Sequence, residues 1–244
     1  DRSHHSELAK LAAAGHPVIR LTLKDAFDVG AEFFRWELAT ATAAALLGVN
    51  PFDEPDVTAA KDKTATLLAA WKKSRRLPEW RVAAETDTVA LLMPPGSEAG
   101  TVAEGLAQHL ALGQPGDYVA FLAYVLPHPD AWNRLQEIRT LVRDRYHLAT
   151  TVAYGPRYLH STGQLHKGGP PKGLFIQITG EDTEDPAIPG AGYGFGTLKA
   201  AQALGDLETL ASTGRRVIRL HLRGKPLPAL DKVAHLVRAA TKKA

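Results

Sequence analysis

Short apolar segments alternate along this chain with longer segments of helical character, and this alternation restricts the possible folds more than any other feature. The apolar segments are rich in β-branched residues and are bounded by turn residues, which is typical of buried strands. We predict strands over 18–23, 88–93, 118–125, 148–154, 173–179 and 216–222, and helices over 7–15, 29–47, 57–73, 101–112, 131–146, 196–213 and 229–243.

Strands that alternate with helices predict an α/β fold with a mostly parallel sheet and helices on its faces. Connections between neighbouring parallel strands are then expected to be right-handed crossovers. The helix predicted over 29–47 carries large apolar residues on several faces, among them Phe33, Trp36 and Leu47. We therefore expect this helix to be buried on more than one side.

Residues 7–23 are repeated without gaps in residues 206–222, and nine of the seventeen aligned pairs are identical. Two unrelated helix–strand units would share fewer positions than this. We predict two related α/β units, of which 1–75 is the C-terminal portion of the first and 76–244 is the second. The alternative is convergent patterning of two similar elements.

The composition excludes several classes of protein. No cysteine is present, so disulfides and thiolate metal sites are excluded, and the cytoplasm is a compatible compartment. No apolar run reaches the roughly 18 residues of a membrane-spanning helix. A formal charge of +3 spread along the chain gives little support for a nucleic-acid partner, which needs a concentrated patch. The chain opens at Asp1 and its only methionine is Met93, so we expect a fragment or a processed product.

The segment 157–170, between two of the predicted strands, concentrates the groups that could carry chemistry. It contains two histidines, the aliphatic hydroxyls of Ser161 and Thr162, an amide, two cations and three glycines. A polar, glycine-rich loop held between buried strands is a common place for binding and catalysis. The candidate residues are His160, Ser161, Thr162, Gln164, His166 and Lys167.

These residues are compatible with several kinds of site. A metal would need a third ligand, and no cluster of recognised spacing lies nearby, so no metal is expected. Hydroxyls and glycine amides, with Lys167 for charge, could bind a phosphate. A histidine titrates near neutral pH and suits acid–base catalysis. The alternative is that the segment only caps and braces a surface loop, and composition does not decide between these interpretations.

Two stretches of the chain resemble glucose-6-phosphate isomerases. Residues 45–61, which read Ala-Leu-Leu-Gly-Val-Asn-Pro-Phe-Asp-Glu-Pro-Asp-Val-Thr-Ala-Ala-Lys, resemble the C-terminal signature of that family. Residues 155–170 resemble the corresponding segment of bacterial proteins that fuse transaldolase to this isomerase. The likeness continues through 194–199 to Leu222, and so covers most of the chain.

The resemblance implies an aldose–ketose isomerase of carbohydrate metabolism, which interconverts glucose 6-phosphate and fructose 6-phosphate through a cis-enediol. It also implies sugar isomerase (SIS) domains of flavodoxin-like architecture, a cytoplasmic location, and no metal or organic cofactor. In the family a glutamate transfers the proton between C1 and C2, while a histidine and a lysine assist ring opening. Lys61 matches the signature lysine. The glutamate and the main phosphate-binding loop are expected upstream of residue 1, so the fragment alone is expected to be inactive.

The chain departs from the family pattern at two points. Glu54 replaces the signature glutamine, and an anion near a phosphorylated sugar would repel it, so its role is expected to differ. The histidine segment here follows the lysine signature, whereas it precedes it in ordinary isomerases, so it could serve a site in its own chain or in a partner's. Of the two histidines, His166 is slightly favoured over His160, because it follows the Gly-Gln pair more closely.

The resulting hypothesis assigns ring opening to Lys61 and one histidine, His166 or His160. Its expected partners are the sugar phosphate, the upstream isomerase or transaldolase portion of the same protein, and a second copy in a homodimer. The alternative is a non-catalytic sugar-phosphate-binding or assembly module, in which Glu54 marks a decayed site. The expected substrate-binding residues are Ser161, Thr162, Gln164, Lys167 and Glu54.

Overall fold

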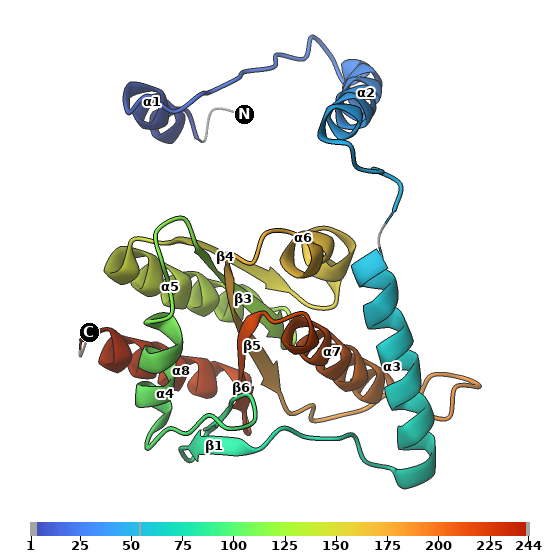
Figure 1. Cartoon of the computed structure of the whole chain (residues 1–244), viewed down its shortest axis with the longest axis vertical. Helices are drawn as coiled ribbons and strands as arrows, with labels where there is room; N and C mark the ends of the chain where they lie inside the picture. The colour runs from blue at the N-terminus through green and yellow to red at the C-terminus, as the bar shows by residue number, and fades with distance from the viewer. Residues whose placement is uncertain (1–3, 54, 243–244) are drawn as a thin grey trace. The chain divides into compact units, whose positions relative to one another are not determined.

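The computed structural model describes residues 4–53 and 55–242 (Figure 1). The chain divides into two compact units, Asp1–Asp53 and Glu54–Ala244, here called unit 1 and unit 2. Within the described ranges, no helix is both long and apolar enough to cross a membrane.

Unit 2 is built on a six-stranded sheet with the strand order β1-β2-β6-β5-β3-β4. The four strands β3, β4, β5 and β6 are parallel, while β2 runs antiparallel to β6 and β1 antiparallel to β2. The predicted mostly parallel sheet is therefore confirmed. The strands are β1 (Val82–Glu85), β2 (Val89–Leu92), β3 (Tyr118–Tyr124), β4 (Ala149–Tyr154), β5 (Gly173–Gly180) and β6 (Arg216–Leu222).

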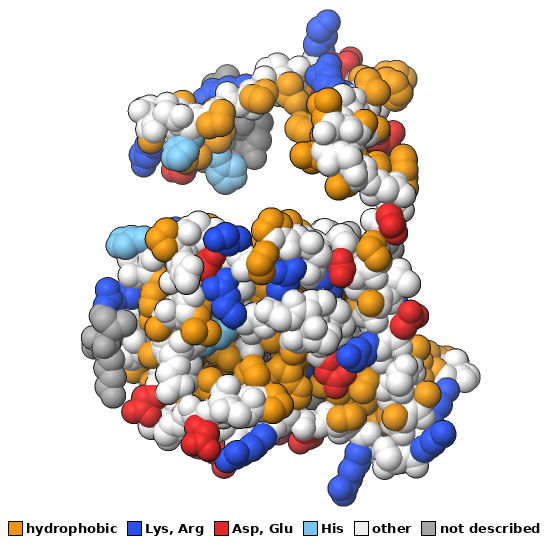
Figure 2. Space-filling model, viewed as in Figure 1, with side chains coloured by type: hydrophobic (Ala, Val, Ile, Leu, Met, Phe, Trp, Pro, Cys, Tyr) orange, Lys and Arg blue, Asp and Glu red, His pale blue; other side chains and the backbone are white. Residues whose placement is uncertain are grey.

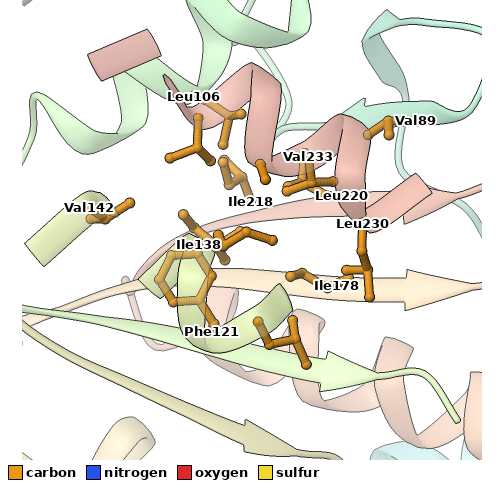
Figure 3. Close-up of a cluster of buried hydrophobic side chains, with 14 of the residues drawn as sticks. Val89, Leu106, Phe121, Ile138, Val142, Ile178, Ile218, Leu220, Leu230 and Val233 are labelled. Atoms are coloured by element: carbon orange, nitrogen blue, oxygen red, sulfur yellow. The ribbon is translucent and has the colours of Figure 1, made fainter. Parts of the chain in front are cut away.

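Helices cover both faces of this sheet, which gives the flavodoxin-like layering expected from the sequence. On one face α4 (Val102–Leu110) and α5 (Pro129–Tyr146) each pack against α8 (Pro226–Lys242). Figure 3 shows their core, in which Leu106, Ile138 and Val233 are buried together with side chains from β3, β5 and β6. Because both faces are covered, the central strands are continuous apolar runs rather than alternating ones.

On the opposite face, α7 (Phe195–Ser212) lies against the sheet and α3 (Pro55–Ser74) packs on α7. The two helices approach closely at Gly205, where a Cβ atom would lie 2.9 Å from the Thr64 hydroxyl. Compactness thus groups α3 with unit 2. The two related units inferred from the repeat, 1–75 and 76–244, stay a prediction. A division by compactness does not test whether two segments share a common origin.

Unit 1 contains α1 (His5–Ala13) and α2 (Asp28–Leu47), which confirms two predicted helices. The strand predicted over 18–23 is wrong for this structure, since those residues form no strand. A strand requires a neighbour for its backbone hydrogen bonds, and the described part of unit 1 contains no other strand. The expected burial of α2 on several sides is also absent, because Ala44 is its one buried residue.

Candidate functional site

The topology of unit 2 indicates that a ligand could bind at the carboxyl ends of its central parallel strands. From β3 the chain crosses to β4 on one side, and from β5 it crosses to β6 on the other, although β3 and β5 are direct neighbours. At such a switch point the connections after the two strands diverge and leave a crevice at their carboxyl ends.

A cavity of about 610 Å³ lies at this switch point, within the usual size range for small-molecule sites. Its walls come from the chain just after β3, from the end of β4 and the following turn, from the segment after β5, and from the first turns of α7. The residues used below are Arg157, His160, Asp182, Glu184, Lys199 and Gln202.

A smaller cavity of about 170 Å³ adjoins the first and is formed between α3 and the segment after β4. Lys61 and His160 both line it, so the signature lysine and one candidate histidine share a single cavity. His160 and Gln202 line both cavities, which makes the two spaces neighbours.

The segment expected to be a loop is largely helical. It forms a short 3-10 helix, η1 (Arg157–His160), followed by α6 (Gly163–Gly168). This arrangement separates its two histidines: His160 is exposed at the end of η1, whereas His166 is buried within α6.

His166 lies in an aromatic cluster and lines neither of the two cavities described above. Its Nδ1 atom is 2.8 Å from the Tyr118 hydroxyl, and its ring contacts Phe175 edge-on at a centroid distance of 5.1 Å. Burial lowers the pKa of His166 to about 4, although Asp206 opposes this shift. The histidine that the sequence slightly favoured is therefore a neutral core residue, and the cavities favour His160.

Lys167 is also buried and forms an ion pair with Asp206, with a distance of 2.6 Å between Nζ and Oδ1. The hydroxyl of Tyr158, from η1, donates a hydrogen bond to the other carboxylate oxygen of Asp206. Asp206 thus joins α7 to α6 through Lys167 and to η1 through Tyr158, and Lys167 is engaged inside the protein.

Gln164 attaches α6 to the start of α3. Its amide Nε2 donates to Asp56 Oδ2 at 2.6 Å, and its Oε1 accepts from the Asp56 backbone N–H at 3.2 Å. The reciprocal pair fixes the first turn of the helix that carries Lys61. Gln164 therefore has a positioning role in this structure.

The remaining predicted substrate-binding residues have varied places. Ser161 is exposed, and its hydroxyl donates to the backbone carbonyl of Tyr158 at 3.2 Å. Thr162 precedes α6 without capping it through its side chain. Glu54 lies outside the described residues.

Several cavity residues were not selected from the sequence, notably Asp182, Lys199 and Gln202. Asp182 belongs to the acidic, proline-rich segment 181–189, which is exposed over most of its length, and it lines the cavity and pairs with Lys199. The signal that could have found these residues is their position after a buried parallel strand and on the first turns of the next helix.

The N-terminus of α7 is closed by Asp185. Its carboxylate accepts from the backbone N–H of Gly196 at 2.6 Å and from that of Thr197 at 3.2 Å. Partial burial pushes the pKa of Asp185 upward, but these hydrogen bonds outweigh it and hold the pKa below its usual value. The helix end is thus occupied by a carboxylate from the chain itself, and a phosphate would have to bind elsewhere.

No group of three or more metal-ligating side chains occurs among the residues that the structure describes. No protein-family model matches the sequence, and no curated protein matches it. Among solved structures, the chain is similar to a hypothetical protein, TT0462, from Thermus thermophilus, at 25% identity and a TM-score of 0.46. That match covers 58% of this chain and 39% of TT0462, and we transfer no property from it.

Proposed function

We propose that this chain is the C-terminal part of an aldose–ketose isomerase that interconverts glucose 6-phosphate and fructose 6-phosphate. One observation carries the proposal: Lys61 and His160, which belong to two separate family-like motifs, line the same small cavity beside the switch-point crevice. The α/β layering of unit 2 is compatible with this function but is shared by many others.

In this proposal Lys61 and His160 open the sugar ring. Opening requires a proton on the ring oxygen and removal of a proton from the hydroxyl of the anomeric carbon, which is C1 in glucose 6-phosphate and C2 in fructose 6-phosphate. An imidazole can accept or donate a proton near neutral pH, and an ammonium can donate hydrogen bonds to the ring oxygen. The small cavity would hold the reacting end of the sugar, and the larger cavity the remainder.

The larger cavity offers charge for an anionic substrate. Arg157 and Lys199 line it, and guanidinium and ammonium groups are the usual partners of phosphate. Two carboxylates, Asp182 and Glu184, line the same space, and Asp182 is paired with Lys199. A phosphate would therefore sit on the side of Arg157.

The base that transfers the proton between C1 and C2 is proposed to come from an upstream portion of the same protein. That portion, whether isomerase or transaldolase, and a second copy in a homodimer are the proposed partners. The cytoplasm is the proposed compartment, and no cofactor is proposed. If the chain is active alone, Glu184 is the first candidate for the base, because it lines the cavity.

The test is isomerase turnover of fructose 6-phosphate by the longest natural polypeptide that contains these residues, compared with residues 1–244. We expect Lys61→Ala and His160→Ala to lower kcat/KM of the longer protein by about 100-fold or more, the usual contribution of an acid–base group. Lys63→Ala, on the same helix, and His235→Ala, exposed on α8, are matched controls and should leave kcat/KM nearly unchanged. Intact activity of the Lys61 and His160 variants would refute the role assignment.

The alternative is a non-catalytic sugar-phosphate-binding or assembly module. It is favoured by the burial of His166 and Lys167, which leaves part of the motif with a structural task. Calorimetric titration with fructose 6-phosphate separates the two. Binding that Lys61→Ala does not weaken, together with no turnover in the longer protein, would establish the module instead of the enzyme.

A further inference from the structure

The second copy of the internal repeat shows what its sequence does inside a complete sheet. Residues 206–222 form the end of α7, the turn at Gly214 and the whole of β6. Strand β6 is paired on one side with β5, in parallel, and on the other with β2. Its apolar side chains are fully buried, with relative exposures of 1% for Ile218 and Leu220.

The first copy has the same sequence pattern without the sheet. The equivalents of Ile218 and Leu220 are Ile19 and Leu21, and their relative exposures are 86% and 47%. The helix that follows, α2, leaves Phe33 and Trp36 more than half exposed. Figure 2 shows hydrophobic side chains gathered over α2. Exposed apolar clusters of this kind mark surfaces that pack against another body.

The order of strands in unit 2 indicates which segment would pack against residues 18–23 and α2. The parallel neighbour of β6 is β5, which precedes it in the chain as β3 and β4 do, and α7 forms the crossover from β5 to β6. By the repeat, α1 corresponds to the end of α7, and 18–23 corresponds to β6. The strands that receive 18–23 should then also precede it in the same polypeptide.

We propose that residues 18–23 form the last parallel strand of a second α/β sheet, whose other strands come from a segment N-terminal to these residues. In this arrangement α2 covers one face of that sheet, as α8 covers the sheet of unit 2. The sheet of unit 2 cannot provide the equivalent place, because β6 already occupies it between β5 and β2. The inference rests on the repeat and on exposure, and it does not depend on the isomerase function.

The test uses single cysteines, because residues 1–244 contain none; any cysteine elsewhere in the longer polypeptide is first replaced by serine. Ile19→Cys and Leu21→Cys probe the first copy, Ile218→Cys is the buried counterpart, and Gln108→Cys, exposed on α4, is the exposed control. Maleimide labelling is measured in residues 1–244 and in the longer natural polypeptide. Hydrogen exchange of the amides of 18–23 in both unsubstituted proteins guards against disruption by the substitutions.

In residues 1–244 we expect Ile19→Cys to react as fast as Gln108→Cys. In the longer polypeptide it should react at least about 100-fold more slowly, as Ile218→Cys does, since a buried strand reacts only when it opens. Equal rates in both proteins would overturn the proposal. Protection that appears in residues 1–244 as their concentration rises would also overturn it, by showing that a second copy covers this surface.

Discussion

The two copies of the repeat end their helices in the same way. In α1 the backbone N–H of Gly15 donates to Ala12 at 3.0 Å and that of His16 to Leu11 at 3.1 Å. In α7 Gly214 donates to Ala211 at 3.0 Å and Arg215 to Leu210 at 2.9 Å. Both glycines have positive φ angles, 84° and 71°, which complete a Schellman motif in each copy.

Beyond the glycine the two copies differ. Residues 217–222 enter a sheet and are mostly buried, whereas residues 18–23 have no regular secondary structure and are mostly exposed. A helix end satisfies its carbonyls from within the next few residues, but a strand must find its partners elsewhere in the chain. The two similar sequences therefore form the same helix cap, but only the copy that has neighbouring strands forms a strand.

The largest expected difference between the copies concerns Asp206 and its aligned residue, Glu7. Asp206→Ala removes one partner of the buried pair with Lys167, and we expect a loss of about 3–5 kcal/mol from the unfolding free energy of unit 2. Glu7 is exposed, so Glu7→Ala should leave that unfolding unchanged. Urea denaturation followed by tryptophan fluorescence measures both. A double replacement, Lys167→Met with Asp206→Leu, should cost much less than Asp206→Ala, because no charge is left unpaired.

The identical pair Leu220 and Leu21 isolates the contribution of burial. Leu220→Ala empties space in the core of unit 2 and should cost about 2–5 kcal/mol. Leu21→Ala in residues 1–244 should lie within about 0.5 kcal/mol of the parent, as surface substitutions do. Urea denaturation followed by tryptophan fluorescence measures the unfolding free energy of both variants. A large effect of Leu21→Ala in residues 1–244 would contradict its exposure, while a large effect only in the longer polypeptide would agree with the second sheet.

The free energy of unfolding of unit 2 should depend on pH, because unit 2 contains two buried histidines. Burial lowers the pKa of His166 to about 4 and that of His109 to about 3, against an ordinary value of 6.5. Below pH 6.5 the unfolded chain binds protons that the folded chain does not, so stability is full above that pH and falls as pH decreases toward 4. The expected slope is about 1.4 kcal/mol per pH unit for each histidine.

His166→Gln should reduce this slope between pH 6.5 and 4. The same substitution at His16, an exposed residue of unit 1, is the matched control. Stability is measured by urea denaturation at successive pH values. An unchanged slope in the His166 variant would show that this imidazole is already protonated in the folded protein.

The smallest expected effect concerns the two glycines. Gly214→Ala places a Cβ atom in a left-handed conformation at the end of α7 and should cost unit 2 about 1 kcal/mol. Gly15→Ala introduces the same local strain in α1 and should not alter the unfolding of unit 2. The melting temperatures of the two variants are measured by near-ultraviolet circular dichroism, which reports on the packing of tryptophan side chains. Equal losses in unit 2 would show that α1 contributes to its stability.

The candidate site was only partly predictable. The sequence selected Lys61 and His160, and the structure brings them to one cavity. It also selected His166 and Lys167, which are buried among aromatic rings and against Asp206. Residue type alone could not separate the two sets. The segment was expected to be a loop, but in α6 the helical period directs the side chains of His166 and Lys167 into the core. Lys199 and Gln202 were missed because they lie on α7, outside both the polar segment 157–170 and the signature-like stretch 45–61.

Sequence alone determined the local features of this protein: the helices, their glycine caps and the continuous apolar runs of the buried strands. These depend on backbone propensity and on contacts within a few residues, so they can be predicted from short windows. Only the tertiary structure decided that β3 and β5 are neighbours, that His160 rather than His166 lines a cavity with Lys61, and that 216–222 forms a strand where 18–23 does not. Those outcomes depend on partners distant in the chain, which no short window contains.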